Sequence, residues 1–280
     1  LREFIGFYKV DLLIVENALT IPLQIPLGLA LTETIVEMQI PTIAHHHDFY
    51  WERTRFLVNA VDDYIQMAFP PKLPSLEHVV INSAAQEELA HRTGIASIVI
   101  PNVLNFESPP LANKTQSEQF KQSIGLKKTD MMILQPTRIV QRKGIEHAID
   151  FVKRLNNPAC KLCISHEAGD EGFEYSEWIS QVAHNNGVDM RMIKTGVDDP
   201  WNHKRNRVGI SLWDVYPHAD FITFPSLYEG FGNAFLEAIY FKKPVLINRY
   251  AIFVRDIEPI GFDLVVMDQF LTQKVIDLAV

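Results

Sequence analysis

The segment from Phe221 to Glu237 reads FITFPSLYEGFGNAFLE and carries the clearest structural signal in the chain. Its first four residues are aromatic or β-branched and predict a buried strand, and the residues from Asn233 onward predict a helix. The loop between them contains Gly230 and Gly232, which allow a ligand to approach the backbone closely. A strand, a glycine-bearing loop and a helix N-terminus in succession are typical of an α/β protein that binds an anion or a polyhydroxyl ligand.

The alternation of strand and helix continues on both sides of this segment. The apolar patterns predict strands at 11–15, 41–44, 78–81, 98–100, 131–135, 161–164, 190–193, 220–224 and 244–247. They predict helices at 21–37, 51–67, 84–92, 144–155, 176–184, 211–216 and 233–241, with Asn82 and Ser83 capping the third. Strands that alternate with helices indicate βαβ units and parallel sheets.

One stretch interrupts this alternation. Residues 101–115 contain Pro101, Pro109 and Pro110 together with Asn and Ser, a composition typical of a linker. We therefore predict two Rossmann-like α/β domains, the first over residues 1–108 and the second over 109–280.

The composition is that of an ordinary globular protein, with 280 residues, 47% apolar and 21% charged. The net charge of −8 argues against a general nucleic-acid binder, which needs a basic surface. No stretch reaches the roughly 18 apolar residues of a transmembrane helix, which leaves peripheral membrane contact open. Cys160 and Cys163 lie in a predicted strand with no second ligand pair, which favours two reduced core cysteines in a cytoplasmic protein over a redox or zinc pair.

A second loop follows the strand at 131–135. It carries Arg138, Arg142 and Lys143, and Gly144 then precedes a helix. Three cations at the carboxyl end of a strand, beside a helix N-terminus, are suited to clamping phosphate. The alternative is a solvated basic loop without a ligand.

Two carboxylates accompany the glycine-bearing loop. Glu229 lies in the loop, and Glu237 lies about one turn into the helix. A carboxylate accepts strong hydrogen bonds from sugar hydroxyls. The alternative is a favourable acid at a helix N-terminus together with a solvated Glu.

Taken together, these two loops resemble the retaining sugar-nucleotide glycosyltransferases of the GT-B fold, family 4, also called group 1. That family carries an Arg…Lys-Gly loop, which corresponds here to Arg138 and Lys143-Gly144. It also carries a Glu-x7-Glu motif that begins with Glu-Gly-Phe-Gly, which corresponds here to Glu229 to Glu237. The resemblance extends over about residues 79–247. It implies a GT-B architecture of two Rossmann-like domains.

The resemblance also implies residue roles. Arg138 and Lys143 would bind the donor diphosphate, Glu229 would meet the donor sugar, and Glu237 would hold the ribose hydroxyls. The backbone of the loop would assist the donor sugar through Gly230, Phe231, Gly232 and Asn233. Preorganised charge at the leaving group is usually the largest contribution to the rate.

A third feature is the run His45-His46-His47-Asp48, which follows the predicted strand at 41–44. In the family, a His in the corresponding loop contacts the donor sugar, and the resemblance makes His47 the candidate. A metal site built from His45, His47 and Asp48 is an alternative, as is a structural histidine cluster. Further candidates for acceptor or sugar contacts are Glu16, Asn17 and Asp48.

The resemblance implies transfer of a sugar from a nucleotide-diphosphate donor to an acceptor hydroxyl with retention, in carbohydrate biosynthesis. It implies no permanently bound cofactor or metal, and an acceptor that is a sugar, a lipid-linked sugar or a small polyol. Alternatives are a non-catalytic nucleotide-sugar-binding or scaffold protein, and an epimerase or phosphorylase of the same fold. Residues 1–101 resemble only the later part of the family's first domain, so we expect a fragment or an incomplete homologue.

Overall fold

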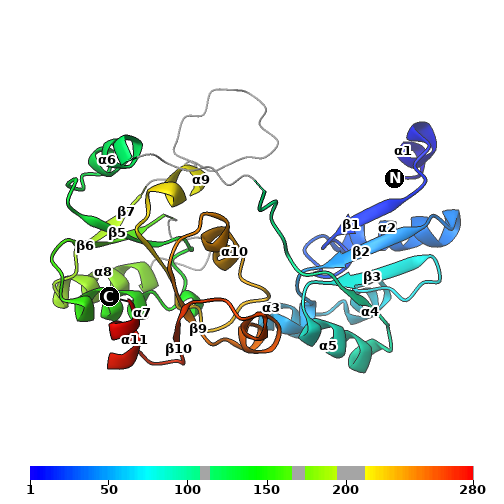
Figure 1. The fold of residues 1–280 in the computed structure, drawn as a ribbon. Helices are drawn as coiled ribbons and strands as arrows, with labels where there is room; N and C mark the ends of the chain where they lie inside the picture. Colours follow the sequence, from blue (N-terminus) through cyan, green and yellow to red (C-terminus); the bar gives the residue numbers. More distant parts are fainter. Residues whose placement is uncertain (108–113, 166–173, 194–211, 280) are drawn as a thin grey trace. The chain divides into compact units, whose positions relative to one another are not determined.

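A computed structural model describes the chain except for residues 108–113, 166–173, 194–211 and 280. The chain divides into two compact units, unit 1 over Leu1–Asn102 and unit 2 over Val103–Val280 (Figure 1). The division falls before the predicted boundary at residue 108. Ile100 still donates a backbone hydrogen bond to Val80 of unit 1 (2.9 Å), whereas the ring of Phe106 contacts Tyr240 of unit 2 (6.0 Å between centroids).

Unit 1 contains a parallel sheet with the strand order β1-β2-β3-β4. Its strands are β1 (Leu13–Glu16), β2 (Thr42–His46), β3 (Leu76–Val80) and β4 (Ile98–Val99), and its helices are α1 (Arg2–Tyr8), α2 (Ile25–Met38), α3 (Thr54–Leu57), α4 (Asp62–Ala68) and α5 (Ser83–Thr93). Strand β2 is longer than predicted and includes His45 and His46, because both residues pair with β3. The predicted cap of α5 is present, since the Asn82 side chain accepts a hydrogen bond from the Ala85 amide (2.7 Å).

The continuous helix predicted at 51–67 is wrong. The segment forms a short 3-10 turn, η1 (Tyr50–Glu52), followed by α3 and α4. Asn59 separates the two helices: its side chain accepts from the Val61 amide (2.9 Å) and donates to the Phe56 carbonyl (3.1 Å). Such local side-chain bonds compete with the helical backbone pattern, and periodicity alone does not register them.

Unit 2 contains a parallel sheet with the strand order β10-β9-β8-β5-β6-β7. Its strands are β5 (Met131–Gln135), β6 (Cys160–Ile164), β7 (Met190–Met192), β8 (Phe221–Phe224), β9 (Val245–Asn248) and β10 (Val265–Met267). Its helices are α6 (Lys114–Ser123), α7 (Ile145–Leu155), α8 (Glu174–Asn185), α9 (Leu212–Val215), α10 (Asn233–Tyr240) and α11 (Gln273–Ala279), with shorter turns η2 (Gln141–Lys143), η3 (Tyr216–His218), η4 (Phe253–Ile257) and η5 (Glu258–Ile260).

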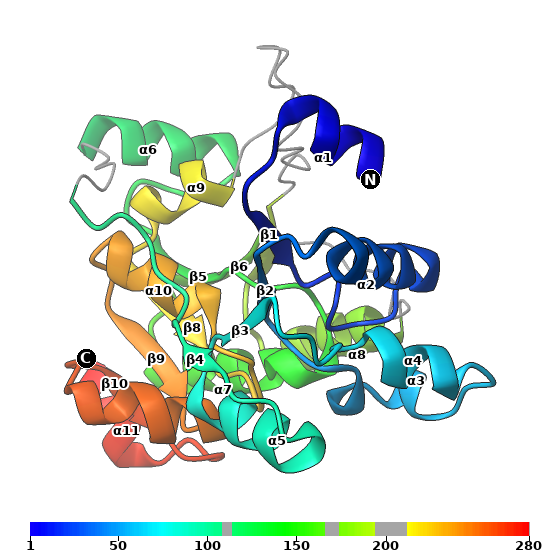
Figure 2. The ribbon, with the colours of Figure 1, turned by 90° about the vertical axis from the view of Figure 1, so that its right-hand side faces the viewer.

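Helices cover both faces of this sheet. Helices α7, α8 and α11 pack together on one face, and α10 lies on the other (Figures 1 and 2). The sequence did not predict α6, which begins inside the expected linker, or β10. Pro109, Pro110 and the predicted helix start at Ser211 lie outside the described residues.

The core of unit 2 lies between β5, β6 and the helices α7 and α8. Ile145, Ala148, Ile149 and Val152 form the buried stripe of α7, which has the period of an amphipathic helix. Cys160 and Cys163 are buried and form no disulfide, as the sequence predicts. Burial raises the pKa of the Cys163 thiol to about 12, so it stays protonated at neutral pH and is a poor nucleophile. Within the described ranges, no helix combines the length and apolarity needed to cross a membrane.

Candidate functional site

The two loops that the sequence singled out meet at the carboxyl edge of the unit 2 sheet. They follow β5 and β8, which are neighbouring strands. The Leu227 amide donates to the Arg142 carbonyl (2.8 Å), which ties one loop to the other. Gly144 adopts a φ of +60°, and a Cβ there would lie 2.5 Å from the Pro225 carbonyl oxygen. Only glycine therefore fits this position without a shift of the backbone.

The charged side chains of the two loops form one cluster. The Glu229 carboxylate pairs with the Arg142 guanidinium through Oε2 (3.2 Å) and with the Lys143 ammonium through Oε1. The Glu229 and Lys143 side chains are only 10% and 11% exposed. Removing either partner would leave the other charge buried and unpaired, which strongly destabilises the folded state. The cluster is therefore a coupled unit and not a solvated surface loop.

The cluster carries excess positive charge. Arg138 is exposed and has no carboxylate partner among the described residues, so its guanidinium is available to an anion. Burial lowers the pKa of Lys143, and the neighbouring Glu229 carboxylate opposes that shift. Arg142 and Lys143 thus share one carboxylate and Arg138 has none, an arrangement suited to an anionic ligand such as a diphosphate.

Glu237 lies on the first turns of α10, close to the same cluster. Tyr216 donates its hydroxyl proton to Glu237 Oε2 (2.6 Å). Burial raises the pKa of Glu237, while the Tyr216 hydrogen bond and the Lys143 charge lower it. Within the described part of the chain Oε1 of Glu237 accepts no hydrogen bond, so one oxygen remains open to a ligand hydroxyl.

The glycine-bearing loop is held tightly at the start of α10. Gly232 has a φ of +109°, and a Cβ there would lie 2.5 Å from the Tyr250 hydroxyl. That hydroxyl donates to the Phe231 carbonyl (2.6 Å), and the Phe231 side chain is buried. Gly230 is half-buried and Asn233 is exposed at the first helical position. The loop is therefore held in place by contacts within unit 2.

Sequence reasoning assigned no function to the residues that support this site. Gln135, at the end of β5, donates to the Lys143 carbonyl (3.4 Å) and accepts from Thr223 (2.7 Å). Tyr216 and Tyr250 were likewise given no role. Gln135 could have been singled out in the sequence, because it is a polar residue at the end of an apolar strand. The partners of the two tyrosines are visible only in the fold.

In unit 1, the predicted residues also gather at the carboxyl edge of the sheet. Glu16 ends β1 and is in register with His45 in β2. Glu16 Oε2 lies 2.9 Å from His45 Nδ1 and 3.2 Å from His47 Nε2. His45 and His47 share a face because successive side chains of an extended chain alternate. Their rings lie 4.7 Å apart.

The intervening His46 points the other way, into the core. It is 1% exposed and bonds to Thr20 Oγ1 (2.5 Å) and to His78 Nδ1 (2.8 Å). Burial lowers the pKa of His46 to about 3 and that of His78 to about 4. Both imidazoles are therefore neutral and structural at physiological pH.

Asn17 and Asp48 position the segment around His47. Asn17 Oδ1 accepts from the His47 amide (3.1 Å), and Asn17 Nδ2 donates to Asp48 Oδ1 (3.4 Å). The Asp48 carboxylate also pairs with Arg53. Asp48 is thus neutralised by a cation, and Glu16 is the carboxylate that contacts the histidines.

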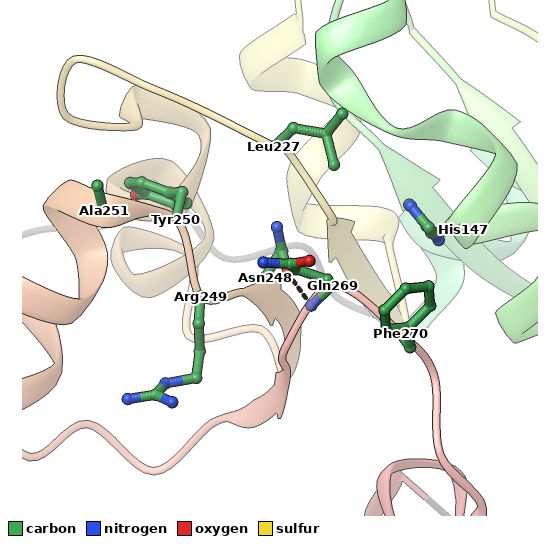
Figure 3. Close-up of a pocket in the computed structure, with 8 residues that line it drawn as sticks. All are labelled: His147, Leu227, Asn248, Arg249, Tyr250, Ala251, Gln269 and Phe270. Carbon is green, nitrogen blue, oxygen red and sulfur yellow. Dashed lines mark hydrogen bonds between the residues drawn. The ribbon is translucent and has the colours of Figure 1, made fainter.

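A separate cavity of about 460 Å³ lies beside the ends of β8 and β9 (Figure 3). None of the predicted donor-binding residues lines it; its walls are His147, Leu227, Asn248, Arg249, Tyr250, Ala251, Gln269 and Phe270. Asn248 already bonds to the Ser226 carbonyl and the Gln269 amide, and Arg249 pairs with Glu258 and Asp268. Because its main polar groups are occupied, this cavity is a weaker candidate than the charged cluster.

The family of the chain follows from its similarity to known proteins. The family model for glycosyl transferases group 1 matches residues 116–259, which include both loops of the charged cluster. The chain belongs to the group 1 glycosyltransferases, a class of sugar-transferring enzymes.

Two curated relatives extend the similarity beyond the matched segment. A mannosylglucosylglycerate synthase from Petrotoga mobilis is 37% identical over 91% of this chain and 63% of its own length. One from Thermotoga maritima is 35% identical over 90% of this chain and 60% of its own length. The chain therefore spans a little over half the length of these relatives.

Solved structures share the architecture. A crystal structure of Anabaena HepE in complex with UDP and glucose aligns with a TM-score of 0.69 at 13% identity, over 98% of this chain and 68% of that chain. At that identity the likeness concerns the fold alone. The fold is α/β of the GT-B type, as the sequence resemblance implies.

Proposed function

We propose that the protein transfers a sugar from a nucleotide-diphosphate sugar to an acceptor hydroxyl, with retention of the anomeric configuration. The observation that supports this most directly is the cluster of Arg142, Lys143 and Glu229 beside Glu237 and the N-terminus of α10. Cations, paired carboxylates and helix amides at one sheet edge match the three parts of such a donor: the diphosphate, the sugar and the ribose.

The donor diphosphate would take the place that Glu229 now occupies against the cations. Arg138 and Lys143 would bind the phosphate oxygens and stabilise the negative charge that grows as the nucleotide leaves. Glu229, released in part from Lys143, would then accept hydrogen bonds from the sugar. Glu237 would hold the ribose through Oε1, because Tyr216 bonds to Oε2.

Retention would follow from attack on the face from which the nucleotide departs. The leaving phosphate would help to remove the proton of the acceptor hydroxyl, so the reaction would need no protein nucleophile. The names of the two curated relatives favour mannose as the transferred sugar and a glycoside of glycerate as the acceptor. The sugar contact predicted for His47 stays a prediction.

A donor screen tests this proposal. Binding of GDP, UDP and ADP and of their sugar conjugates is measured by calorimetry, and transfer is followed by NMR of the anomeric proton. We expect one nucleotide to bind preferentially and the product to keep the donor configuration. An inverted product would contradict retention, and binding without transfer in the full-length protein would favour a non-catalytic nucleotide-sugar-binding protein.

A further inference from the structure

A buried polar side chain connects the loop after β5 to the neighbouring strand β8. Gln135 is the last residue of β5 and is fully buried, as is Thr223 in β8. These two residues directly follow Leu134 and Ile222, which are paired in the sheet, so their side chains lie on the same face. A buried carboxamide is costly unless it is hydrogen-bonded, so the partners of Gln135 are part of the fold.

The amide nitrogen of Gln135 holds the loop after β5 at two points. Its Nε2 donates to Thr137 Oγ1 (2.9 Å) and to the Lys143 carbonyl (3.4 Å). Thr137 directly precedes Arg138, so the two bonds lie at the two ends of the segment that carries the cations. One NH₂ group therefore helps to set the separation between Arg138 and Lys143.

The Thr223 hydroxyl determines which way the Gln135 amide points. It donates to Gln135 Oε1 (2.7 Å), while the Lys143 carbonyl at the other end of the amide can only accept a hydrogen bond. A reversed amide would place its oxygen against that carbonyl. Only one orientation therefore satisfies both ends, and strand β8 fixes the loop after β5 through it.

This contact can affect a ligand only through the loop. Gln135 and Thr223 are both 0% exposed, so neither side chain can touch a bound nucleotide. Groups that bind a ligand perform best when they are held within about 0.5 Å of the productive geometry by buried supporting contacts. The positions of Arg138 and Lys143 thus depend on a side chain that lies outside the charged cluster.

We propose that Gln135, oriented by Thr223, is a positioning residue that sets the geometry of Arg138 and Lys143 for the phosphate groups of the donor. This inference rests on the proposed function and adds to it a residue that does not itself bind the donor. It predicts that loss of the amide weakens recognition of the phosphates and leaves recognition of the base and ribose intact.

Two titrations of the chain test the proposal: calorimetry with the nucleoside diphosphate that the donor screen selects, and NMR with its parent nucleoside. Gln135→Met keeps the length of the side chain and removes the amide. We expect it to weaken binding of the nucleoside diphosphate by at least about fivefold, the equivalent of one lost hydrogen bond. Binding of the nucleoside should stay unchanged, because a nucleoside carries no phosphate. A purely structural role would weaken both ligands together.

Thr223 supplies a second variant and its rescue. Thr223→Val removes the hydroxyl and should weaken binding of the nucleoside diphosphate, whereas Thr223→Ser keeps the donor and should retain the affinity of the wild type. The double variant Gln135→Met/Thr223→Val should bind no more weakly than Gln135→Met alone, because the two residues act as one unit.

Thr42→Val is the matched control. It removes a buried strand hydroxyl in unit 1 that donates to the Ile40 carbonyl (3.0 Å), and it should leave both affinities unchanged. Circular dichroism establishes that each variant is folded. If Gln135→Met does not fold, the comparison of Thr223→Val with Thr223→Ser decides the same question.

Unchanged binding of the nucleoside diphosphate in Gln135→Met and Thr223→Val would overturn the proposal. An equal loss of the nucleoside in these variants would overturn it as well, because the effect would then not concern the phosphates. Both outcomes would leave the proposed function standing. A wild-type chain that binds none of the nucleoside diphosphates would instead refute the proposed function, and this inference with it.

Discussion

Lys143 is the residue on which the charge balance of the unit 2 cluster depends. Its ammonium is buried, its pKa is lowered by that burial, and its partner is the Glu229 carboxylate. A buried cation beside an exposed one, Arg138, can contribute strongly to binding of a diphosphate because little solvent screens it.

We expect Lys143→Ala to weaken binding of the preferred nucleoside diphosphate by about 1.5–3 kcal/mol, the usual contribution of hydrogen bonds to charged groups. Calorimetry measures the change. Lys153→Ala is the matched control, because Lys153 is exposed on α7 and its ammonium bonds only to Asn186 among the described residues. Unchanged affinity in Lys143→Ala would refute the phosphate role.

The two glutamates should respond differently to substitution. Glu229→Ala removes an anion that competes for Lys143, so binding of the free nucleoside diphosphate should be preserved or tightened, while binding of the sugar-bearing donor weakens. Glu237→Ala should weaken both, because it removes a ribose acceptor. The ratio of the two affinities, measured by calorimetry for each variant, separates the roles. An equal loss of free nucleoside diphosphate in both variants would contradict this division.

At the scale of elements, the contact between the loops after β5 and β8 depends on Gly144. Its positive φ and its approach to Pro225 both exclude a side chain. Gly187 supplies a control, since it has a similar φ of +67° but a Cβ there would meet no atom within 4 Å. The two sites together separate the cost of the backbone conformation from the cost of the steric clash.

We expect Gly187→Ala to lower the free energy of unfolding by about 1 kcal/mol through backbone strain. Gly144→Ala should cost about 1–3 kcal/mol more and should also weaken nucleotide binding. Urea denaturation gives both stabilities. Equal losses in the two variants would show that the loops do not depend on this contact.

The pairing of β2 with β3 buries the neutral imidazoles of His46 and His78. In the folded protein their pKa values are about 3 and about 4, whereas the ordinary value is 6.5. Below pH 6.5 the unfolded chain binds protons that the folded chain excludes, so acid favours unfolding. Stability is therefore greatest above pH 6.5 and falls as the pH approaches the folded values.

As the pH falls below 6.5, we expect each of these histidines to contribute a loss of about 1.4 kcal/mol per pH unit to the free energy of unfolding of unit 1. Urea denaturation between pH 7 and 5 measures the slope. The double variant His46→Leu/His78→Leu should be less stable throughout but show a flatter slope in this window. An unchanged slope would contradict the assignment.

At the scale of the whole molecule, each unit carries its own candidate site. The charged cluster belongs to unit 2, and Glu16 with His45 and His47 belongs to unit 1. A ligand that binds a folded unit stabilises it by about 2.7 kcal/mol at a hundredfold excess over the dissociation constant.

Hydrogen exchange measured by mass spectrometry should locate the bound nucleotide. We expect the nucleoside diphosphate to protect mainly residues 138–145 and 226–238 and to leave the exchange of residues 13–17 and 42–48 unchanged. The two unit 1 ranges thus serve as an internal control. A lack of nucleotide protection in the two unit 2 ranges would contradict the placement of the donor.

The sequence by itself determined most of the strands and helices and the class of the protein. β5 was predicted residue for residue, because an apolar run bounded by polar residues defines a buried strand locally. The two loops that form the charged cluster could also be recognised in the sequence, since each is short and carries its charged residues close together. The helix predicted at 51–67 failed because the Asn59 side chain interrupts it through contacts that hydrophobic periodicity does not encode.

Only the tertiary structure decided which groups are partners. Glu229 pairs with Arg142 and Lys143, Tyr216 with Glu237, and Glu16 instead of Asp48 with the histidines. Glu16 and His45 are 29 positions apart in the chain and meet because β1 and β2 are parallel and in register. Register across a sheet is set by the packing of many side chains at once, so no local pattern contains it.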